Sequence, residues 1–227
     1  MGILTLITLV PFVAVGIIML LPAERLKAIK QVSLVAAGID VALAVWLVFD
    51  ALERVATPGP AGAPPLWHVE RHAWLDKLGI EYYFGVDGVA VLMILLTAVV
   101  IFCGVLASWR HEHRGKEFFA FLLLLVGGVF GVFASQDLFL FFLFYEIAVL
   151  PMYLLIGLWG TGPKEYSAMK LTLMLMGGSA LIIVGILVLF FQSGSPTFAM
   201  DAIAARGIAP ATQAWVFPLM FFGFGTL

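Results

Sequence analysis

The chain has 227 residues, of which 63% are hydrophobic and only 11% are charged, and its mean hydropathy is +1.11. These values lie far outside the range of a soluble globular domain and indicate an integral membrane protein. The net charge of −2 offers no basic field for nucleic acid, and the sequence has no phosphate-binding glycine motif, paired-cysteine metal site or nucleophile elbow. The single cysteine, Cys103, lies in an apolar run, where it most simply acts as a small hydrophobe.

A membrane-spanning helix needs about 20 mostly apolar residues, and six segments of the sequence meet that criterion. A further apolar run begins near Ala211. We therefore predict an all-α fold, a polytopic transmembrane helix bundle in which residues 1–227 form a single domain with six complete spans and the start of a seventh. The polar breaks place the complete spans at residues 2–22, 31–52, 86–108, 118–134, 137–159 and 168–191.

The basic residues divide unevenly between the two ends of these spans. The connections after the first, third and fifth spans carry Arg25, Lys27, Lys30, Arg110, Arg114, Lys116 and Lys164. The connections on the other side carry only Arg54, Arg71, Lys77 and Arg206. Because short cytoplasmic loops are enriched in Lys and Arg, this asymmetry predicts a multi-pass protein of the inner (cytoplasmic) membrane with its N-terminus outside.

The longest connection, residues 53–85, is predicted to be an external loop. It opens with the turn-rich stretch TPGPAGAPP and continues with aromatic residues interleaved with charges. His68 and His72 have an i, i+4 spacing that could bind a metal ion on a helix, but no third ligand accompanies them, so a solvated loop face is favoured. The rings suited to the headgroup level of a bilayer are those of Trp67, Trp74, Tyr82 and Tyr83.

Ionisable residues inside the spans are informative, because each costs about 2.5–3.5 kcal/mol at the centre of a membrane helix. Asp40 lies in the second span, Glu146 in the fifth and Lys170 near the start of the sixth. Asp87 and Asp137 lie closer to span ends. No proline or second polar residue accompanies Asp40 nearby in the sequence, so we assign it no role.

Glu146 lies in the stretch FLFYEIAVLPMY, about nine residues into the fifth span. With a rise of about 1.5 Å per residue, its carboxyl is expected near the bilayer midplane. Pro151 should kink or loosen the helix and free the carbonyl of Ile147, which would create a polar niche. Two interpretations remain open: a neutral glutamic acid that hydrogen-bonds a neighbouring helix, and a group that carries protons, which we favour.

Lys170 lies only a few residues from the expected cytoplasmic surface. Its long apolar stem could therefore extend outward and keep the ammonium group in the headgroup region at little cost. Alternatively, the side chain turns inward and forms part of a proton path, where its charge would favour the anionic state of nearby carboxylates. The residues alone favour neither interpretation.

Three stretches of the sequence resemble the antiporter-like subunits of respiratory complex I, and most closely the members called subunit M or chain 4. They are YYFGVDGVAVLMILLT entering the third span, DLFLFFLFYEIAVLPMYLLIGLWG covering the fifth, and KEYSAMKLTLMLMGGSALI opening the sixth. The stretch of the fifth span is the most specific. The resemblance implies a longer, proton-pumping subunit built from two inverted repeats, each with a broken helix and a proton half-channel.

The resemblance also implies roles for individual residues. In this family a mid-span glutamate of the fifth helix, matched here by Glu146, pairs with a lysine on the broken seventh helix. A lysine of the sixth span, matched by Lys170, is counted among the channel residues. Leu227 stands at the position of the seventh-helix lysine, so either the register differs or a lysine beyond the end serves as the partner. Because the sequence stops at FFGFGTL inside an apolar run, we expect it to be an N-terminal fragment of a longer chain.

The function implied by the resemblance is that of a proton-translocating membrane subunit of NADH-quinone oxidoreductase (complex I). Glu146 would load protons and Lys170 would be a secondary residue of the path. When a partner cation moves away, Glu146 would bind a proton, and when the cation returns the proton would be expelled. The enzyme would be a translocase coupled to distant quinone reduction, with no redox chemistry on this chain.

The expected partners are the other membrane and peripheral subunits of complex I, the lipid bilayer and protons. We find no motif for NADH, flavin, an iron-sulfur cluster or quinone, so no cofactor and no metal are expected on this chain. Two alternatives stay open. One is a subunit of a related cation/proton antiporter or membrane-bound hydrogenase, and the other is a scaffold helix bundle without a transport path.

Overall fold

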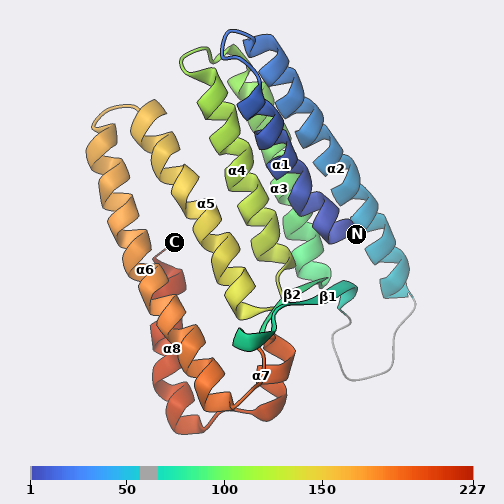
Figure 1. The fold of residues 1–227 in the computed structure, drawn as a ribbon, viewed down its shortest axis with the longest axis vertical. Helices are drawn as coiled ribbons and strands as arrows, with labels where there is room; N and C mark the ends of the chain where they lie inside the picture. The colour runs from blue at the N-terminus through green and yellow to red at the C-terminus, as the bar shows by residue number, and fades with distance from the viewer. Residues whose placement is uncertain (1, 57–65, 227) are drawn as a thin grey trace. The chain divides into compact units, whose positions relative to one another are not determined.

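A computed structural model describes residues 2–56 and 66–226 of the chain, and most of them are helical (Figure 1). Within these residues, six helices are long and apolar enough to cross a membrane. They are α1 (Ile3–Leu20), α2 (Leu26–Ala56), α3 (Gly88–Ala107), α4 (Gly115–Ala134), α5 (Leu138–Trp159) and α6 (Lys164–Ser193). The predicted transmembrane helix bundle is confirmed.

Three of these helices are longer than the predicted spans, and α4 is one of them, since it begins at Gly115 rather than near residue 118. Helix α2 begins at Leu26 rather than near residue 31, and α6 begins at Lys164 rather than near residue 168. Hydropathy marks the part of a helix that suits hydrocarbon, whereas the backbone hydrogen bonds of a helix continue into its charged ends. The basic residues of these first turns therefore belong to the helices and not to the connections.

The chain divides into two compact units, and the first consists of residues 1–70 and 84–134. In this unit α1 packs against α4 and α2, and α3 packs against α2 and α4. Small residues allow the close approach, since a Cβ atom added to Gly127 of α4 would lie 3.0 Å from the ring of Phe12 in α1. The inward face of α2 repeats at helical spacing and includes Ile29, Ala37 and Ala44, each fully buried.

The second unit consists of residues 71–83 and 135–227. Helix α6 packs along both α5 and α8 (Pro210–Gly225), and the short helix α7 (Met200–Arg206) connects toward α8. Helices α6 and α8 meet through glycines: a Cβ atom on Gly178 would lie 2.8 Å from the carbonyl oxygen of Gly223. The predicted apolar run near Ala211 is thus helix α8, whereas α7 was not predicted.

Within the predicted external loop 53–85, α2 continues to Ala56 and residues 67–86 form a β-hairpin; residues 57–65 lie outside the described part. Strand β1 (Trp67–Leu75) pairs with β2 (Ile80–Val86) across the 3-10 turn η1 (Asp76–Leu78). Gly79 closes the turn with a φ of 69°, and a Cβ atom there would lie 2.2 Å from the carbonyl oxygen of Pro196. Only glycine fits both the left-handed backbone and this close approach.

The hairpin changes the interpretation of several loop residues. His68 and His72 lie on strand β1, so their i, i+4 spacing is not that of one face of a helix. Trp67 and Tyr83 are buried within the chain, with exposed fractions of 8% and 4%, and their rings are therefore not free to contact headgroups. Trp74, at 50% exposed, keeps the surface position that an interfacial anchor requires.

Candidate functional site

Glu146 lies near the middle of α5, the helix predicted to carry the function. It follows the first helical residue, Leu138, by about 12 Å along the axis. The residue is half-buried, and its Oε1 atom is buried with no hydrogen-bond partner in the described part of the chain. Since buried polar atoms are nearly always hydrogen-bonded, this oxygen requires water, a proton to share, or a group outside the described residues.

Tyr145, the preceding residue, presents a second such atom, and the sequence reasoning did not single it out. Its side chain is buried, and its hydroxyl also has no hydrogen-bond partner among residues 2–56 and 66–226. The ring lies stacked near Phe142, with centroids 6.3 Å apart, which fixes its position on the helix. Two adjacent residues of α5 thus carry unsatisfied buried oxygens, a signal that apolar sequence context alone does not reveal.

The start of α5 is fixed by Asp137, whose side chain is fully buried. One carboxylate oxygen accepts the backbone N–H groups of Phe139 and Leu140 at 2.9 and 3.0 Å, and the other accepts that of Glu81 at 3.2 Å. Burial raises the pKa of this carboxyl, and the three N–H donors oppose that rise. Asp137 therefore acts as the N-cap of α5 and joins it to the hairpin.

Lys170 lies on the exposed surface of α6 in the described chain. Together with Tyr166, Met169 and Leu173 it lines a shallow surface groove of about 400 Å³. Within the described residues, no hydrogen bond or ion pair connects Lys170 to Glu146 or to any other side chain. The structure thus does not bring the two predicted site residues into direct contact.

The C-terminal end of α8 lies beside the same part of α5. The ring of Phe224 contacts that of Phe141 with centroids 5.8 Å apart, and Phe141 precedes Glu146 by little more than one helical turn. Leu227, the residue at the predicted lysine position, lies outside the described residues. The α5–α8 contact nevertheless brings the end of the seventh apolar segment toward the turn that precedes Glu146.

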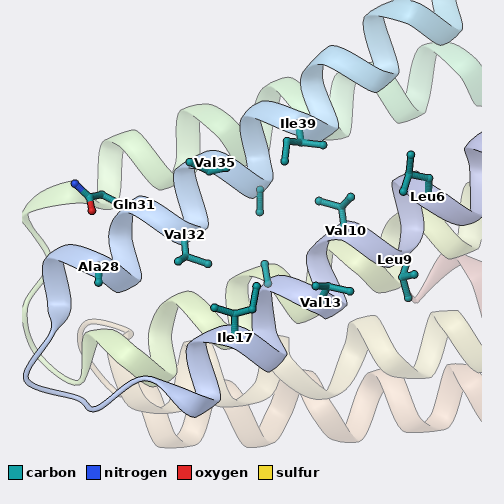
Figure 2. A pocket seen from close by; sticks show the side chains of 12 residues that line it. Leu6, Leu9, Val10, Val13, Ile17, Ala28, Gln31, Val32, Val35 and Ile39 are labelled. Carbon is teal, nitrogen blue, oxygen red and sulfur yellow. The ribbon is translucent and has the colours of Figure 1, made fainter.

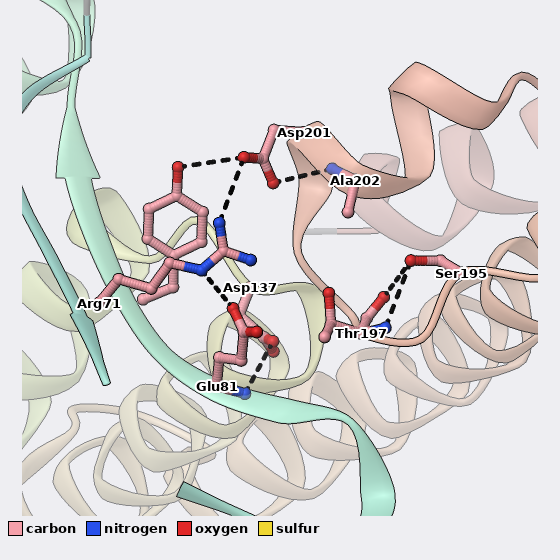
Figure 3. A network of polar contacts seen from close by, with 8 residues as sticks. Arg71, Glu81, Asp137, Ser195, Thr197, Asp201 and Ala202 are labelled. Atoms are coloured by element: carbon pink, nitrogen blue, oxygen red, sulfur yellow. Dashed lines mark hydrogen bonds and ion pairs between the residues drawn. The ribbon is translucent and has the colours of Figure 1, made fainter. Parts of the chain in front are cut away.

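A polar network joins the hairpin to α7 at one end of this unit (Figure 3). Arg71 of β1 donates to Glu81 of β2 at 2.6 Å, lies 3.7 Å from the carboxylate of Asp201, and covers the ring of Tyr83 at 4.7 Å. The hydrogen bond with Glu81 raises the pKa of Arg71 further above its ordinary value. Burial is the main cause that raises the pKa of Tyr83, and the Asp201 charge adds to it. These groups hold the hairpin and α7 together.

In the first unit, Asp40 is the only fully buried carboxylate among the described residues that has no hydrogen bond. Its exposed fraction is 0%, and neither of its side-chain oxygens has a partner there. Asp87, by contrast, is explained by its local contact, because its carboxylate accepts the N–H of Ala90 at 2.7 Å and caps α3. The structure thus explains Asp87 as a helix cap, whereas Asp40 has no local contact in the described residues that explains it.

The described residues contain no group of three His, Cys, Asp or Glu side chains placed to hold a metal ion. Cys103 is a free thiol on the exposed face of α3.

Comparison with known proteins places this arrangement in a defined class. The fold is that of the antiporter-like membrane subunits of complex I, and residues 135–226 match the family model described as NADH:quinone oxidoreductase/Mrp antiporter, TM. Among such subunits, the chain is similar to NAD(P)H-quinone oxidoreductase chain 4-1 of Synechocystis sp., with 33% identity over 222 residues. That alignment covers 98% of this chain and 41% of the relative. The predicted resemblance is therefore confirmed.

Solved structures agree with this classification. A chain of the respiratory complex I from Thermus thermophilus with bound NADH has 27% sequence identity and a TM-score of 0.82, covering 98% of this chain and 43% of that one. A chain of the Mrp complex from Dietzia sp. shares the fold, with a TM-score of 0.71 at 21% identity and coverage of 97% and 23%. The present chain spans about two fifths of the length of the curated relatives it matches.

Proposed function

We propose that the chain is a proton-translocating membrane subunit of an NADH-quinone oxidoreductase in which Glu146 loads and releases a proton. The observation that carries this proposal is the position of Glu146: a half-buried carboxyl near the middle of α5, with Oε1 buried and unpartnered among the described residues. The likeness to chain 4 over 98% of the chain supports the subunit assignment.

The chemistry follows from how an environment sets the affinity of a carboxyl for its proton. Partial burial favours the neutral form of Glu146, whereas a cation nearby favours the anion. A partner cation that approaches and retreats would therefore release and reload the proton at one position in the membrane. Because Lys170 is exposed and forms no ion pair with Glu146 in the described residues, it is not that partner, and its secondary role in the path rests on the resemblance to the family.

The remaining parts of the proposal concern the assembly. The subunit works with the other membrane and peripheral subunits of complex I, which carry the electron transfer. It lies in the inner (cytoplasmic) membrane with its N-terminus outside, because the basic residues gather at the opposite ends of the spans. A subunit of a related cation/proton antiporter is the alternative, supported by the family model, whose description names both classes, and by the fold shared with the Mrp complex. Copurification with NADH-linked peripheral subunits would support the first assignment and not the second.

Replacing Glu146 with Gln tests the mechanism, because the change keeps the size of the side chain and removes its titration. We expect the variant complex to assemble and its proton pumping, measured in sealed vesicles with a pH-sensitive dye, to collapse. Quinone reductase activity should fall with pumping, while electron transfer from NADH to an artificial acceptor persists. Glu146→Asp should retain part of the activity.

The matched control is Glu165→Gln, since Glu165 is an exposed glutamate in the first turn of α6. This variant should pump like the unaltered complex. Normal pumping by the Glu146→Gln complex would leave Glu146 a packing residue and refute the mechanism.

A further inference from the structure

A long apolar groove runs between α1 and α2 in the first unit (Figure 2). Its volume is about 530 Å³, and aliphatic side chains from the two helices face the space between them. Along α2 the lining extends from Ala28 to Ile39, a length of about 16 Å. Representative lining residues are Leu6, Val10, Val13 and Ile17 of α1 and Val32 and Val35 of α2.

A second pocket, rich in basic side chains, adjoins one end of the groove. Ala28 and Gln31 line both hollows, so the two adjoin each other. The charged residues of the second pocket are Glu24, Arg25, Lys27, Lys30, Arg110 and Glu112, four cations against two anions. Across the described residues, none of the four basic side chains forms a hydrogen bond or ion pair that would neutralise it.

Lys30 is the most distinctive of these cations. Lys30 has an exposed fraction of only 8%, but its ammonium nitrogen is not among the buried unpartnered atoms of the described residues, so its charged end reaches the open pocket. An anion in the pocket would be attracted by this charge and by the three other cations that line it. Four cations against two anions around an open pocket, with no ion pair of those cations in the described residues, therefore point to an anionic ligand.

We propose that the groove and the basic pocket together bind one anionic glycerophospholipid. Its phosphate lies between Lys30, Lys27 and Arg110, and one acyl chain fills the groove between α1 and α2. The length of the groove, about 16 Å, corresponds to half of a hydrocarbon core of about 30 Å and so to a single leaflet. Trp109, which also lines the basic pocket, places an aromatic ring at the headgroup level.

The pocket lies at the end of the helices where anionic lipids are expected in the membrane. Its basic residues lie at the start of α2 and just before it, and at the end of the third span, which the proposed orientation assigns to the cytoplasmic side. Anionic lipids give the cytoplasmic leaflet its negative surface potential, and basic pockets between membrane helices bind their headgroups. A zwitterionic lipid would fill the groove equally well but would leave the excess positive charge uncompensated.

The unaltered complex provides the first test. It is reconstituted in vesicles that contain a trace of phospholipid with a photoreactive acyl chain, carrying either a phosphatidylglycerol or a phosphatidylcholine headgroup. After irradiation, we expect the phosphatidylglycerol probe to label peptides of α1 and α2 that contain Val13 or Val35, well above the phosphatidylcholine probe. Equal labelling by the two probes, or a groove closed to both of them by a protein segment, would overturn the proposal.

Variants of the complex provide the second test. The measured quantity is the ratio of labelling by the phosphatidylglycerol probe to labelling by the phosphatidylcholine probe on the same peptides. Lys30→Gln should lower the preference for phosphatidylglycerol about fivefold, since one basic residue near an anionic surface contributes about a factor of five. Val35→Trp should lower labelling by both probes, because the larger ring fills the groove. Lys77→Gln, which removes a basic residue outside the pocket, is the control and should change neither. An unchanged ratio in the assembled Lys30→Gln complex would exclude the site.

Discussion

The carboxylate of Glu70 in β1 accepts the backbone N–H of Leu4 at 2.9 Å, and this contact joins the hairpin to the start of α1 across 66 residues of sequence. The same carboxylate accepts the N–H of Thr5 at 3.3 Å. Helix α1 has no acidic residue in its own first turn and no side-chain cap from Gly2, so Glu70 replaces the missing local cap. At the other end, Lys116 donates to the carbonyl oxygens of Met19 and Leu21 at 2.9 and 2.8 Å.

We expect Glu70→Ala to destabilise the protein by about 1 kcal/mol, because two N–H groups of the first turn lose their acceptor and the helix dipole loses a negative charge. Glu70→Gln should cost less, since its amide oxygen can still accept these hydrogen bonds. Thermal unfolding of the purified complex in detergent, followed by the circular dichroism of its helices or by subunit dissociation, would measure the order. Equal stability of the Ala variant and the unaltered protein would contradict the capping role.

The N-cap of α5 leads to a second prediction, because the carboxylate of Asp137 is fully buried. Asp137→Ala removes the acceptor of three backbone N–H groups and should cost about 2 kcal/mol, the upper end for a lost N-cap. Asp137→Asn keeps an acceptor and removes the ionisation, so it should be much less harmful.

The stability of the Asp137→Asn variant should also depend on pH differently from that of the unaltered protein. Burial raises the pKa of Asp137 above 3.8, so the folded state binds its proton more tightly than the unfolded state does. The resulting stability is present below pH 3.8 and is lost as the pH rises through the folded-state pKa. The Asn variant lacks this loss, and its stability relative to the unaltered protein should therefore rise as the pH increases above 3.8. A stability difference between the two proteins that does not change with pH would show that burial does not raise the pKa of Asp137.

The sequence predicted the six long helices because hydropathy reports directly on which segments suit hydrocarbon. It did not predict the β-hairpin, whose strands are held by contacts remote in sequence, such as the hydrogen bond from the Gln136 N–H to the Tyr83 carbonyl at 2.8 Å. Strand preference depends on such packing more than on local residue type. The strand WHVERHAWL also lacks a clear alternation of apolar and polar residues.

The candidate site was predictable to a similar extent. Glu146 could be identified because a carboxylate inside an apolar helix is conspicuous in the sequence. The capping contacts of Asp87 and Asp137 could have been inferred, since each immediately precedes a long apolar helix. The unsatisfied hydroxyl of Tyr145 could not, because tyrosine is common in membrane helices and only the burial of its oxygen marks it.

Asp40 leads to a prediction about stability. A carboxyl that is fully buried without a hydrogen bond in the described structure is destabilising, and an amide of the same shape is cheaper to bury. We therefore expect Asp40→Asn to raise the unfolding temperature of the complex. Ser33→Ala is a suitable control on the same helix, because Ser33 is equally buried but donates to the carbonyl oxygen of Ile29 at 3.0 Å, and its loss should not stabilise. A clear loss of stability in the Asn variant would indicate that Asp40 has a partner outside the described residues.

The last prediction concerns Lys170, whose two interpretations differ in what its charge does. The side chain lies on the exposed face of α6, with Tyr166 and Met174 one turn away on either side, and forms no ion pair within the described structure. If the ammonium group only extends to the headgroup region, its removal should leave pumping unchanged. If the charge acts on the proton path, Lys170→Ala should reduce pumping in part and leave assembly intact, which is the result we expect.

Two further variants separate the charge of Lys170 from the shape of its side chain. Lys170→Met keeps the apolar stem and loses the charge, so it should pump as poorly as the Ala variant. Lys170→Arg keeps the charge and should pump nearly normally, as should the control Lys77→Ala, which removes a lysine from the turn between β1 and β2. The measurement is the initial rate of dye quenching in sealed vesicles at equal NADH oxidation. Because these rates compare proton transfer at a fixed electron flux, a Met variant that pumps normally would assign Lys170 to the membrane surface and remove it from the path.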